Sequence, residues 1–523
     1  MTLINKEKIN FSTDGSGPLE KQYFVDPTRP DGAKELARLG GEVIETLGKI
    51  YSYRGDIDKL RQQDPETYLW LNSKMHGEGR QRLRSLMGEV LMREFETRRF
   101  DELFMGQLHP QGSEAAILGA MIGIYMNTNT IVKEVSIAEH EMEWEVLDWY
   151  AEMFGYDKNT YSGNIVTGGT SANITALWVA REKSKYELQK RDRSEYRKHN
   201  GKVERSYRVG QKSWFIASGM SHYSISKAVG RGRGLLGDNA FLARAETQGF
   251  KTSPKSVEEL IIQLRKRGEH VAGVIGLAGE TETGLVDNLV DLGEVCRKYG
   301  VHFHVDAAYG GPFIMSNASH LFKGIELADS ITVDPHKYGF VPYHCGIVLF
   351  KDSEAHALVQ KDAPYLQEKD NKGILGPREK RNFGLSARIE GSMGSGGAIS
   401  AWVSMRLFGR KGYASLLNHG IKLAEYAHEL VEDSHILRPL HRPELNGLLV
   451  GIDSNLENDR RTDLVARSRQ QLFEETGIYI ADTGKLDCGG GCFRTVFTHP
   501  FTNEHHVEMM VQNLERIVWN NIR

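Results

Sequence analysis

The feature that most constrains the fold is an alternation of short apolar runs with longer amphipathic segments, which begins near Gly106. The apolar runs are "SWFIAS", "VAGVIGLA", "VHFHVDAA", "SITVD" and "GIVLF". Runs of this length suit buried strands, and the segments between them are long enough for helices. Strands separated by helices form a mostly parallel sheet with helices on both faces. The sequence therefore predicts an α/β fold here, with any ligand site at the carboxyl ends of the strands.

The segments on either side follow other patterns, so the sequence predicts three parts. Residues 1–105 mix Gly and Pro with helical pieces such as "AKELARLGGEVIETLGKIYSY", which predicts a helical amino-terminal arm. Residues 106–398 are the predicted large domain that carries the sheet. Residues 399–523 have helical and strand patterns in turn, which predicts a small α+β carboxyl-terminal domain.

Composition excludes several classes of function. The chain has 523 residues and a net charge of only −3, which gives no electrostatic footprint for nucleic acid or an anionic membrane. The longest apolar run, "AAILGAMIGIYM", is shorter than the roughly 20 residues that a membrane span needs, and the amino terminus lacks the apolar region of an export signal. Four cysteines without paired spacing indicate neither a disulfide framework nor a metal site. We therefore expect a cytoplasmic protein that binds no nucleic acid, membrane or metal.

Lys337 is the first candidate for chemistry, because it directly follows the buried run in "SITVDPHK". Burial removes water from an ammonium group and lowers its pKa, and a neutral amine can attack an aldehyde. The alternative is a surface lysine whose head reaches solvent.

Asp306 closes a second apolar run, and a buried carboxylate needs a cation or hydrogen-bond donors. It can keep the ring nitrogen of a pyridine cofactor protonated, which makes the ring an electron sink, and the small residues Ala307 and Ala308 would let the ring lie close. Pairing with an arginine is the alternative.

A phosphate site is predicted in "NIVTGGTSANITALW", where an apolar strand leads into a Gly-Gly-Thr-Ser turn and a helix. Backbone N–H groups and the hydroxyls of Thr170 and Ser171 can cradle an anion there, although a helix cap without a ligand is the alternative. His222 follows another strand and can place a flat imidazole against a cofactor ring, or can simply be a core or surface histidine. Each of these residues follows a strand, so a parallel sheet would bring them to one edge.

The stretch "HVDAAYGG" followed by "DSITVDPHK" resembles the group II pyridoxal-phosphate-dependent amino-acid decarboxylases, which have the aspartate-aminotransferase fold, or fold type I. Within that family, "ITVDPHKYGFVPY", "GLAGETETGLVD" and "RIEGSMGSGGAISAW" are most similar to the bacterial tyrosine decarboxylases and the archaeal tyrosine/aspartate decarboxylases. The resemblance implies a large domain that binds pyridoxal 5'-phosphate. It also implies a homodimer with active sites between the subunits, and removal of the α-carboxylate of an L-amino acid as carbon dioxide.

Residue by residue, the resemblance makes Lys337 the lysine that binds the cofactor as a Schiff base, with Asp306 on the pyridine nitrogen and His222 stacked on the ring. His336 would lie beside that linkage. Tyr365, in "KDAPYLQEKDNKG", would protonate the substrate carbon from a loop that closes over the site. The implied cofactor-binding residues are Gly169, Thr170, Ser171, His222, Thr281, Asp306, Ala308, Asp334, His336 and Lys337.

One stretch departs from the animal and plant aromatic decarboxylases, which have an arginine-containing segment where this chain has "EGSMGSGG". The departure favours the bacterial and archaeal branch and leaves the partner subunit's phosphate contacts, around residues 392–397, open. The related stretch of that branch also resembles the sphingosine-phosphate lyases. A carbon–carbon lyase of that type is therefore one alternative function, and a catalytically silent paralogue is another.

The substrate is predicted from polar residues near the strand ends, namely Gln107, His109, Tyr338 and His344. Their polar and partly basic character suits a phenol or a second carboxylate, so tyrosine or another aromatic amino acid, aspartate and glutamate are the candidates in that order. The alternative is that these residues only cap secondary structure.

Overall fold

The computed structural model describes residues 30–53, 56–72, 79–95, 101–132, 135–198, 212–230, 232–360, 387–453, 456–484 and 490–522. The chain separates into two compact units, Met1–Asp101 and Glu102–Arg523. In the described residues no helix is long and apolar enough to cross a bilayer.

The described part of the first unit is helical. Its helices are α2 (Pro30–Ser52), α3 (Ile57–Gln63), α4 (Pro65–Leu71) and α5 (Gly79–Phe95). Asp56 and Asp64 cap α3 and α4, because each carboxylate accepts a hydrogen bond from a backbone N–H of the first turn. Leu60, Trp70 and Leu91 form a small core between the helices. None of the residues predicted for chemistry belongs to this unit.

A seven-stranded sheet with the order β1-β9-β8-β7-β6-β2-β3 forms the centre of the second unit. Its strands are β1 (Ser162–Val166), β2 (Ser213–Ser218), β3 (Ala240–Ala245), β6 (His270–Leu277), β7 (His302–Asp306), β8 (Ser330–Val333) and β9 (Gly346–Phe350). The strands from β8 to β3 are parallel, whereas β9 is antiparallel to both of its neighbours. The carboxyl ends of β1, β2, β6, β7 and β8 therefore share one edge, as the sequence predicts.

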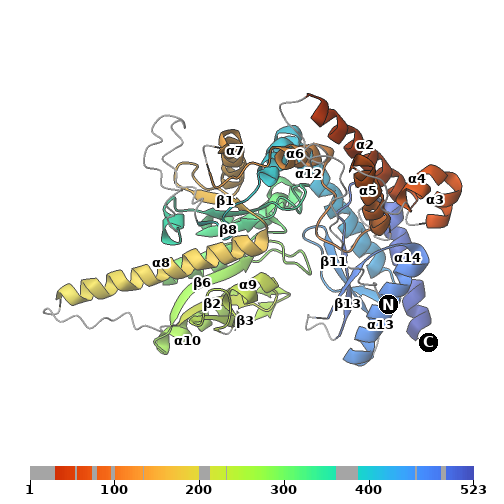
Figure 1. Ribbon diagram of the computed structural model, residues 1–523. Helices are drawn as coiled ribbons and strands as arrows, with labels where there is room; N and C mark the ends of the chain where they lie inside the picture. The colour runs from red at the N-terminus through yellow and green to blue at the C-terminus, as the bar shows by residue number, and fades with distance from the viewer. Residues whose placement is uncertain are drawn as a thin grey trace. The chain divides into compact units, whose positions relative to one another are not determined.

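Helices cover the central sheet, and Figure 1 shows the long helix α8 crossing its strands. The helices before the second sheet are α6 (Glu114–Met126), α7 (Ile137–Met153), α8 (Gly169–Lys198), α9 (Tyr223–Val229), α10 (Pro254–Lys266), α11 (Leu289–Tyr299) and α12 (Gly396–Glu432). Shorter elements are β4 (Thr247–Gln248), β5 (Lys251–Thr252), η2 (Gly311–Met315), η3 (Asn317–Phe322), η4 (Ile325–Leu327) and η5 (Ala355–Leu358). Strands β1, β8 and β9 are buried along their whole length. Burial on both faces explains why β9, with the sequence GIVLF, is a continuous apolar run.

A second, antiparallel sheet with the order β10-β11-β13-β12 follows. Its strands are β10 (Leu437–Pro439), β11 (Gly447–Ile452), β12 (Ala481–Thr483) and β13 (Cys492–Val496), and its helices are α13 (Asn458–Thr476) and α14 (Glu504–Ile522). Leu423, Phe493 and Leu514 share one core, so the end of α12 and helix α14 pack on this sheet. Helix α12 crosses the predicted boundary at residue 398 and leaves helical geometry at Gly409, so that boundary stays a prediction.

Candidate active site

A cavity of about 430 Å³ lies at the carboxyl edge of the central sheet. Its lining comes from the segments that follow β1, β2, β6, β7 and β8. The cavity brings together every residue of the predicted cofactor-binding set: Gly169, Thr170, Ser171, His222, Thr281, Asp306, Ala308, Asp334, His336 and Lys337. They meet because the parallel strands end at one edge.

Lys337 follows β8 in the turn that begins with Asp334, and its side chain is 17% exposed. The Lys337 Nζ lies 3.2 Å from Asp334 Oδ2, so a buried carboxylate holds the amine at the cavity. The His336 Nε2 lies 3.5 Å from the same oxygen. Burial lowers the pKa of His336 although Asp334 opposes the change, so the ring is neutral near pH 7 and the contact with Asp334 is not an ion pair. The His336 Nδ1 donates to the Cys345 carbonyl at 2.7 Å, which leaves Nε2 able to accept a proton.

Asp306 is the last residue of β7, and it is 6% exposed. Its Oδ1 accepts from the Ala308 backbone N–H at 3.2 Å, and its Oδ2 accepts from Asn173 Nδ2 at 2.8 Å. These neutral donors stabilise a carboxylate that lines the cavity. Among the described residues, the hydrogen bonds of Asp306 give no support to the alternative of an arginine partner.

The predicted phosphate turn leads from β1 into α8, whose first residue is Gly169. A Cβ at Gly169 would lie 2.7 Å from Asp334 Oδ2 and 3.1 Å from Ala308 Cβ, so only glycine lets the turn approach the strand ends this closely. The first turn of α8 presents free backbone N–H groups beside the hydroxyls of Thr170 and Ser171. This combination can hold a phosphate group.

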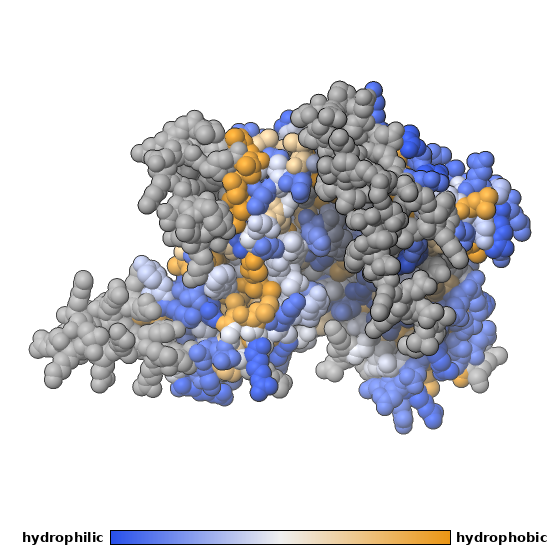
Figure 2. All heavy atoms as spheres, in the orientation of Figure 1, coloured by the Kyte–Doolittle hydropathy of each residue, from blue (hydrophilic) through white to orange (hydrophobic). Residues whose placement is uncertain are grey.

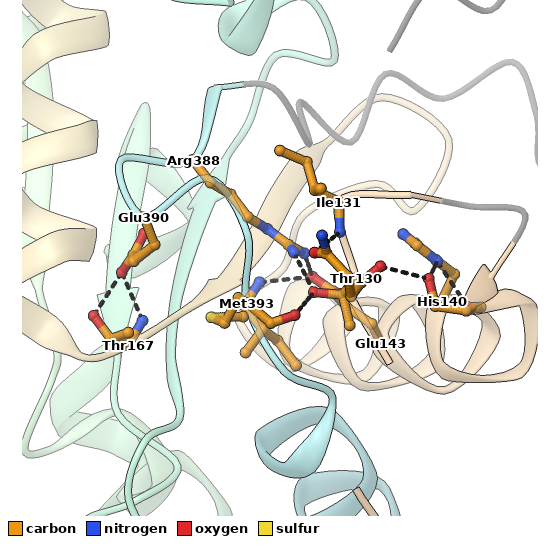
Figure 3. Close-up of polar contacts among 11 residues, drawn as sticks. Thr130, Ile131, His140, Glu143, Thr167, Arg388, Glu390 and Met393 are labelled. Atoms are coloured by element: carbon orange, nitrogen blue, oxygen red, sulfur yellow. Dashed lines mark hydrogen bonds and ion pairs between the residues drawn. The ribbon is translucent and has the colours of Figure 1, made fainter. Parts of the chain in front are cut away.

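A clamp that the sequence did not predict holds the phosphate turn from outside the cavity. Glu390 accepts from the Thr167 backbone N–H at 2.8 Å and from the Thr167 hydroxyl at 2.5 Å (Figure 3). That hydroxyl lies 2.9 Å from Ser171 Oγ. Burial works against ionisation of Glu390, but the bonds from Thr167 outweigh it and lower its pKa. Two residues earlier, the fully buried Arg388 contacts Glu143 and donates to Thr130 Oγ1 at 2.8 Å.

The sequence analysis did not predict four further residues near the site, and three of them line the cavity. These are Asn173, Glu280 and Tyr343 in the cavity lining, and Arg388, which is paired with Glu143. The ring of Tyr343 contacts that of His336 in a tilted arrangement, with centroids 4.2 Å apart. Burial raises the pKa of Tyr343, with Asp334 as a second cause. The spacing of "GGTSAN" offered a signal for Asn173, because it lies one helical turn after the phosphate turn.

The residues predicted for the substrate pocket are divided. His344 lines the cavity, whereas His109 makes an edge-to-face contact with the cavity residue Tyr343, with ring centroids 5.6 Å apart. Gln107 donates to the Tyr479 hydroxyl at 3.3 Å. Tyr338 is buried, stacks on Tyr309 and accepts a hydrogen bond from Asn446, so the structure does not bring it to the cavity. The predicted proton donor Tyr365 lies outside the described residues.

The cavity thus combines an amine, a buried carboxylate, an imidazole and an anion cradle. This donor set fits a phosphorylated aldehyde with a basic ring, because each of its polar groups meets a group of matching chemistry. In the described residues no cluster of metal-ligating side chains was found. An α/β fold with such a site at its strand ends defines the class of pyridoxal-phosphate proteins of fold type I.

Residues 72–440 match the family "Pyridoxal-dependent decarboxylase conserved domain", and the chain belongs to this family. The cofactor of the site is therefore pyridoxal 5'-phosphate, as the sequence predicts. An aspartate 1-decarboxylase of Aliivibrio fischeri is 33% identical over 341 residues, which cover 62% of this chain and 59% of that protein. A probable L-tyrosine/L-aspartate decarboxylase of Methanothermobacter thermautotrophicus is 30% identical over 367 residues, which cover 68% of this chain and 82% of that protein.

The chain thus spans less than two thirds of the first of these relatives. Among solved structures, the glutamate decarboxylase domain of a diaminobutyrate-pyruvate transaminase and L-2,4-diaminobutyrate decarboxylase from Vibrio parahaemolyticus is similar with a TM-score of 0.74. The likeness covers 96% of this chain and 99% of that chain at 18% identity. At this identity it supports the fold, and the predicted fold class is confirmed.

Proposed function

We propose that the protein is a pyridoxal-phosphate-dependent decarboxylase, which removes the α-carboxylate of an L-amino acid to give a primary amine and carbon dioxide. The observation that carries the proposal is the meeting of Lys337, Asp306 and the amino terminus of α8 on one cavity. Family membership and the relatives named for aspartate and tyrosine/aspartate decarboxylation support it. When bound, pyridoxal phosphate supplies an aldehyde that links to amines and a protonated ring that accepts the electron pair left by the carboxylate.

The residues that line the cavity have different roles in the proposed reaction. Lys337 offers the amine that anchors the cofactor, and Asp334 holds that amine in place. Asp306 would accept a hydrogen bond from the protonated ring nitrogen and so stabilise the charged ring. Thr170, Ser171 and the N–H groups of α8 would bind the phosphate, and His222 would lie against the ring. The His336 Nε2 can take up a proton near the reacting carbon, and Asp334 would stabilise the resulting charge.

The substrate we propose is tyrosine or another aromatic amino acid, or an acidic amino acid such as aspartate or glutamate. Tyr343, His344 and Tyr223 add aromatic rings and an imidazole to the lining of the cavity. Aromatic faces suit a phenol ring, and an imidazole can donate to a phenol oxygen or a carboxylate.

A screen of the twenty L-amino acids for released carbon dioxide and amine tests the activity, with Lys337→Ala as the control. We expect one or a few of the named amino acids to give equal amounts of amine and carbon dioxide with the wild type alone. Cleavage of a phosphorylated amino alcohol without carbon dioxide would support the lyase instead. A cofactor-loaded protein that turns over neither class of substrate would support the silent paralogue.

The second part of the proposal is a homodimer, and it is supported by helix α6. The small face of α6 packs against α12, because a Cβ at Gly123 would lie 2.4 Å from Gly396 Cα and one at Gly119 would lie 3.0 Å from Ser400 Cα. The large side chains therefore point away from α12, and Ile124 is 75% exposed. The exposed apolar residues of α6 are Ile117, Leu118, Met121, Ile122, Ile124, Tyr125 and Met126.

Figure 2 shows further hydrophobic residues, in orange, over the part of the surface where Figure 1 shows α7, the helix that follows α6 in the chain. Contiguous apolar surface of this kind marks a binding interface, and a second copy of the chain is the partner that the family resemblance implies. We expect wild-type protein to sediment as a dimer and Ile124→Glu to sediment as a monomer with reduced activity. The matched control is Phe501→Glu, which changes a side chain that is 76% exposed outside α6. A monomeric, fully active wild type would contradict the proposal.

A further inference from the structure

A buried amide connects two of the groups that face the cavity. Asn173 lies in the first turns of α8 and is 1% exposed. Its Nδ2 donates to Asp306 Oδ2 at 2.8 Å and to Ser224 Oγ at 2.9 Å. Its Oδ1 lies 2.9 Å from His304 Nε2. All three heavy-atom distances are those of good hydrogen bonds, so the amide uses both of its hydrogens and its oxygen.

The chemistry of the neighbours fixes the orientation of this amide. A carboxylate only accepts hydrogen bonds, so Asp306 must face the NH₂ group of Asn173. The reversed amide would place its oxygen against the carboxylate oxygen, and both of these atoms are acceptors. Burial lowers the pKa of His304 to about 4, with Asp306 opposing, so the ring is neutral and carries one N–H near pH 7. That N–H is on Nε2, because the Asn173 Oδ1 accepts from it. The His304 Nδ1 is then the acceptor for Ser330 Oγ at 2.9 Å.

The network continues through Ser330 to His302, the first residues of β8 and β7, and its hydrogen bonds are all donated in the same direction. The single hydrogen of Ser330 goes to His304, so His302 Nε2 must donate to Ser330 Oγ, at 2.8 Å. Burial lowers the pKa of His302 to about 4 as well. Each hydrogen bond of this network is therefore donated in the direction of Asn173, and Asn173 donates in turn to the carboxylate of Asp306. The bond from His304 thus helps to fix the orientation of the amide.

The second hydrogen bond of the Asn173 NH₂ group connects it, through Ser224, to His222. Ser224 accepts from Asn173, so its own hydroxyl hydrogen is available for His222 Nδ1, at 2.9 Å. The Ser224 backbone N–H points at the same nitrogen at 3.3 Å. His222 Nδ1 is therefore an acceptor, and in the neutral ring the proton is on Nε2.

We propose that Asn173 is a positioning residue, which fixes the Asp306 carboxylate for the ring nitrogen of the cofactor and, through Ser224, fixes the plane of the His222 ring. The inference deepens the proposed function and rests on the cofactor site described above. The same amide then orients both the Asp306 carboxylate, which would meet the edge of the cofactor ring, and the His222 imidazole, which would lie on its face. Replacing it would leave both residues in place but free to rotate.

The test compares two cofactors on the full-length protein. Apoprotein is titrated with pyridoxal phosphate and with the analogue in which carbon replaces the ring nitrogen, and the apparent Kd of each is measured from the change in tryptophan fluorescence. Only pyridoxal phosphate can form a hydrogen bond to Asp306 through its ring nitrogen. The Kd of the analogue divided by the Kd of pyridoxal phosphate therefore reports on that contact alone. We expect Asn173→Ala to reduce the wild-type ratio about ten-fold, because a hydrogen bond to a charged group is affected.

Two variants separate positioning from mere packing. Ser224→Ala breaks the arm to His222 only, so it should weaken both ligands equally and leave the ratio unchanged. Thr175→Val is the control for the helix, because Thr175 is buried on α8 and its hydroxyl bonds to a carbonyl of that helix. Asn173→Ser serves as a second substitution if Asn173→Ala does not fold, since serine is too short to reach both partners.

The outcomes are distinguishable. A lower ratio in the Asn173 variants with an unchanged ratio in Thr175→Val supports the inference. An equal loss of affinity for both ligands in the Asn173 variants means that the residue only packs, and overturns the inference. If wild-type protein binds neither ligand, the proposed function itself fails, and the inference fails with it.

Discussion

Glu280 provides a prediction whose size follows from the structure. It lies in the turn after β6, lines the cavity and is 3% exposed. Its Oε2 accepts from the backbone N–H groups of Glu282 and Thr283 at 3.0 and 2.8 Å and from the Thr283 hydroxyl at 2.8 Å. Within the described residues its Oε1 has no hydrogen-bond partner. Burial therefore raises the pKa of Glu280 from 4.5 to about 7, despite these donors.

The sign of the effect on stability follows from the direction of the shift. Because the pKa in the folded protein is above that in the unfolded chain, the stability from the neutral carboxyl group is full below pH 4.5 and is lost as the pH rises to about 7. At about 1.36 kcal/mol per pKa unit, the whole shift corresponds to about 3 kcal/mol, and most of it falls between pH 5 and pH 8. The substitution Glu280→Gln keeps an oxygen acceptor for the turn and does not titrate. We expect the free energy of unfolding of the variant, relative to wild type, to rise by about 2.5 kcal/mol from pH 5 to pH 8.

Urea unfolding of both proteins at a series of pH values, at one chain concentration and with the cofactor removed, measures this difference. Glu259→Gln is the matched control, because it removes the same charge from an exposed position on α10. The reasoning is wrong if the difference between Glu280→Gln and wild type stays constant from pH 5 to pH 8, or if the control shows the same change.

Two further substitutions test the site and the buried ion pair between Arg388 and Glu143. Asp306→Asn should lower kcat by several orders of magnitude with only a moderate loss of cofactor, because an amide does not stabilise a charged ring; steady-state kinetics with a near-normal kcat would refute this. Arg388→Met should reduce the free energy of unfolding by about 3–5 kcal/mol, because it leaves the carboxylate of Glu143 buried and unpaired. Adding Glu143→Gln should restore part of that loss in urea unfolding, and a double variant as unstable as the single one would exclude this cause.

Local patterns in the sequence were sufficient for much of the fold and for the cofactor site. Apolar runs mark β2, β6, β7, β8 and β9, and the alternation with helices predicts that the parallel strands β2, β6, β7 and β8 end at one edge. Residues that follow such strands meet by topology alone, which explains why the predicted set around Lys337 and Asp306 lines one cavity. Nothing beyond strand order and the resemblance was needed for that step.

Contacts between distant segments were not predictable in the same way. Asn173 reaches Asp306 across 133 positions, and Arg388 reaches Glu143 across 245, so no local pattern links either pair. Tyr338 was placed in the pocket because it follows Lys337, but its ring faces the core and Tyr343 lines the cavity instead. In an irregular turn the direction of each side chain depends on backbone angles, which periodicity does not give.

The central claim is that the cavity at the strand ends holds pyridoxal phosphate on Lys337. Reduction of the cofactor-loaded protein with borohydride, followed by digestion and mass spectrometry of the peptides, tests it most directly. The account predicts one phosphopyridoxyl group per chain, on the peptide that contains "DPHKYG" and at Lys337, and none in Lys337→Ala. A reduced cofactor on another lysine, or an undiminished amount in Lys337→Ala, would contradict the account.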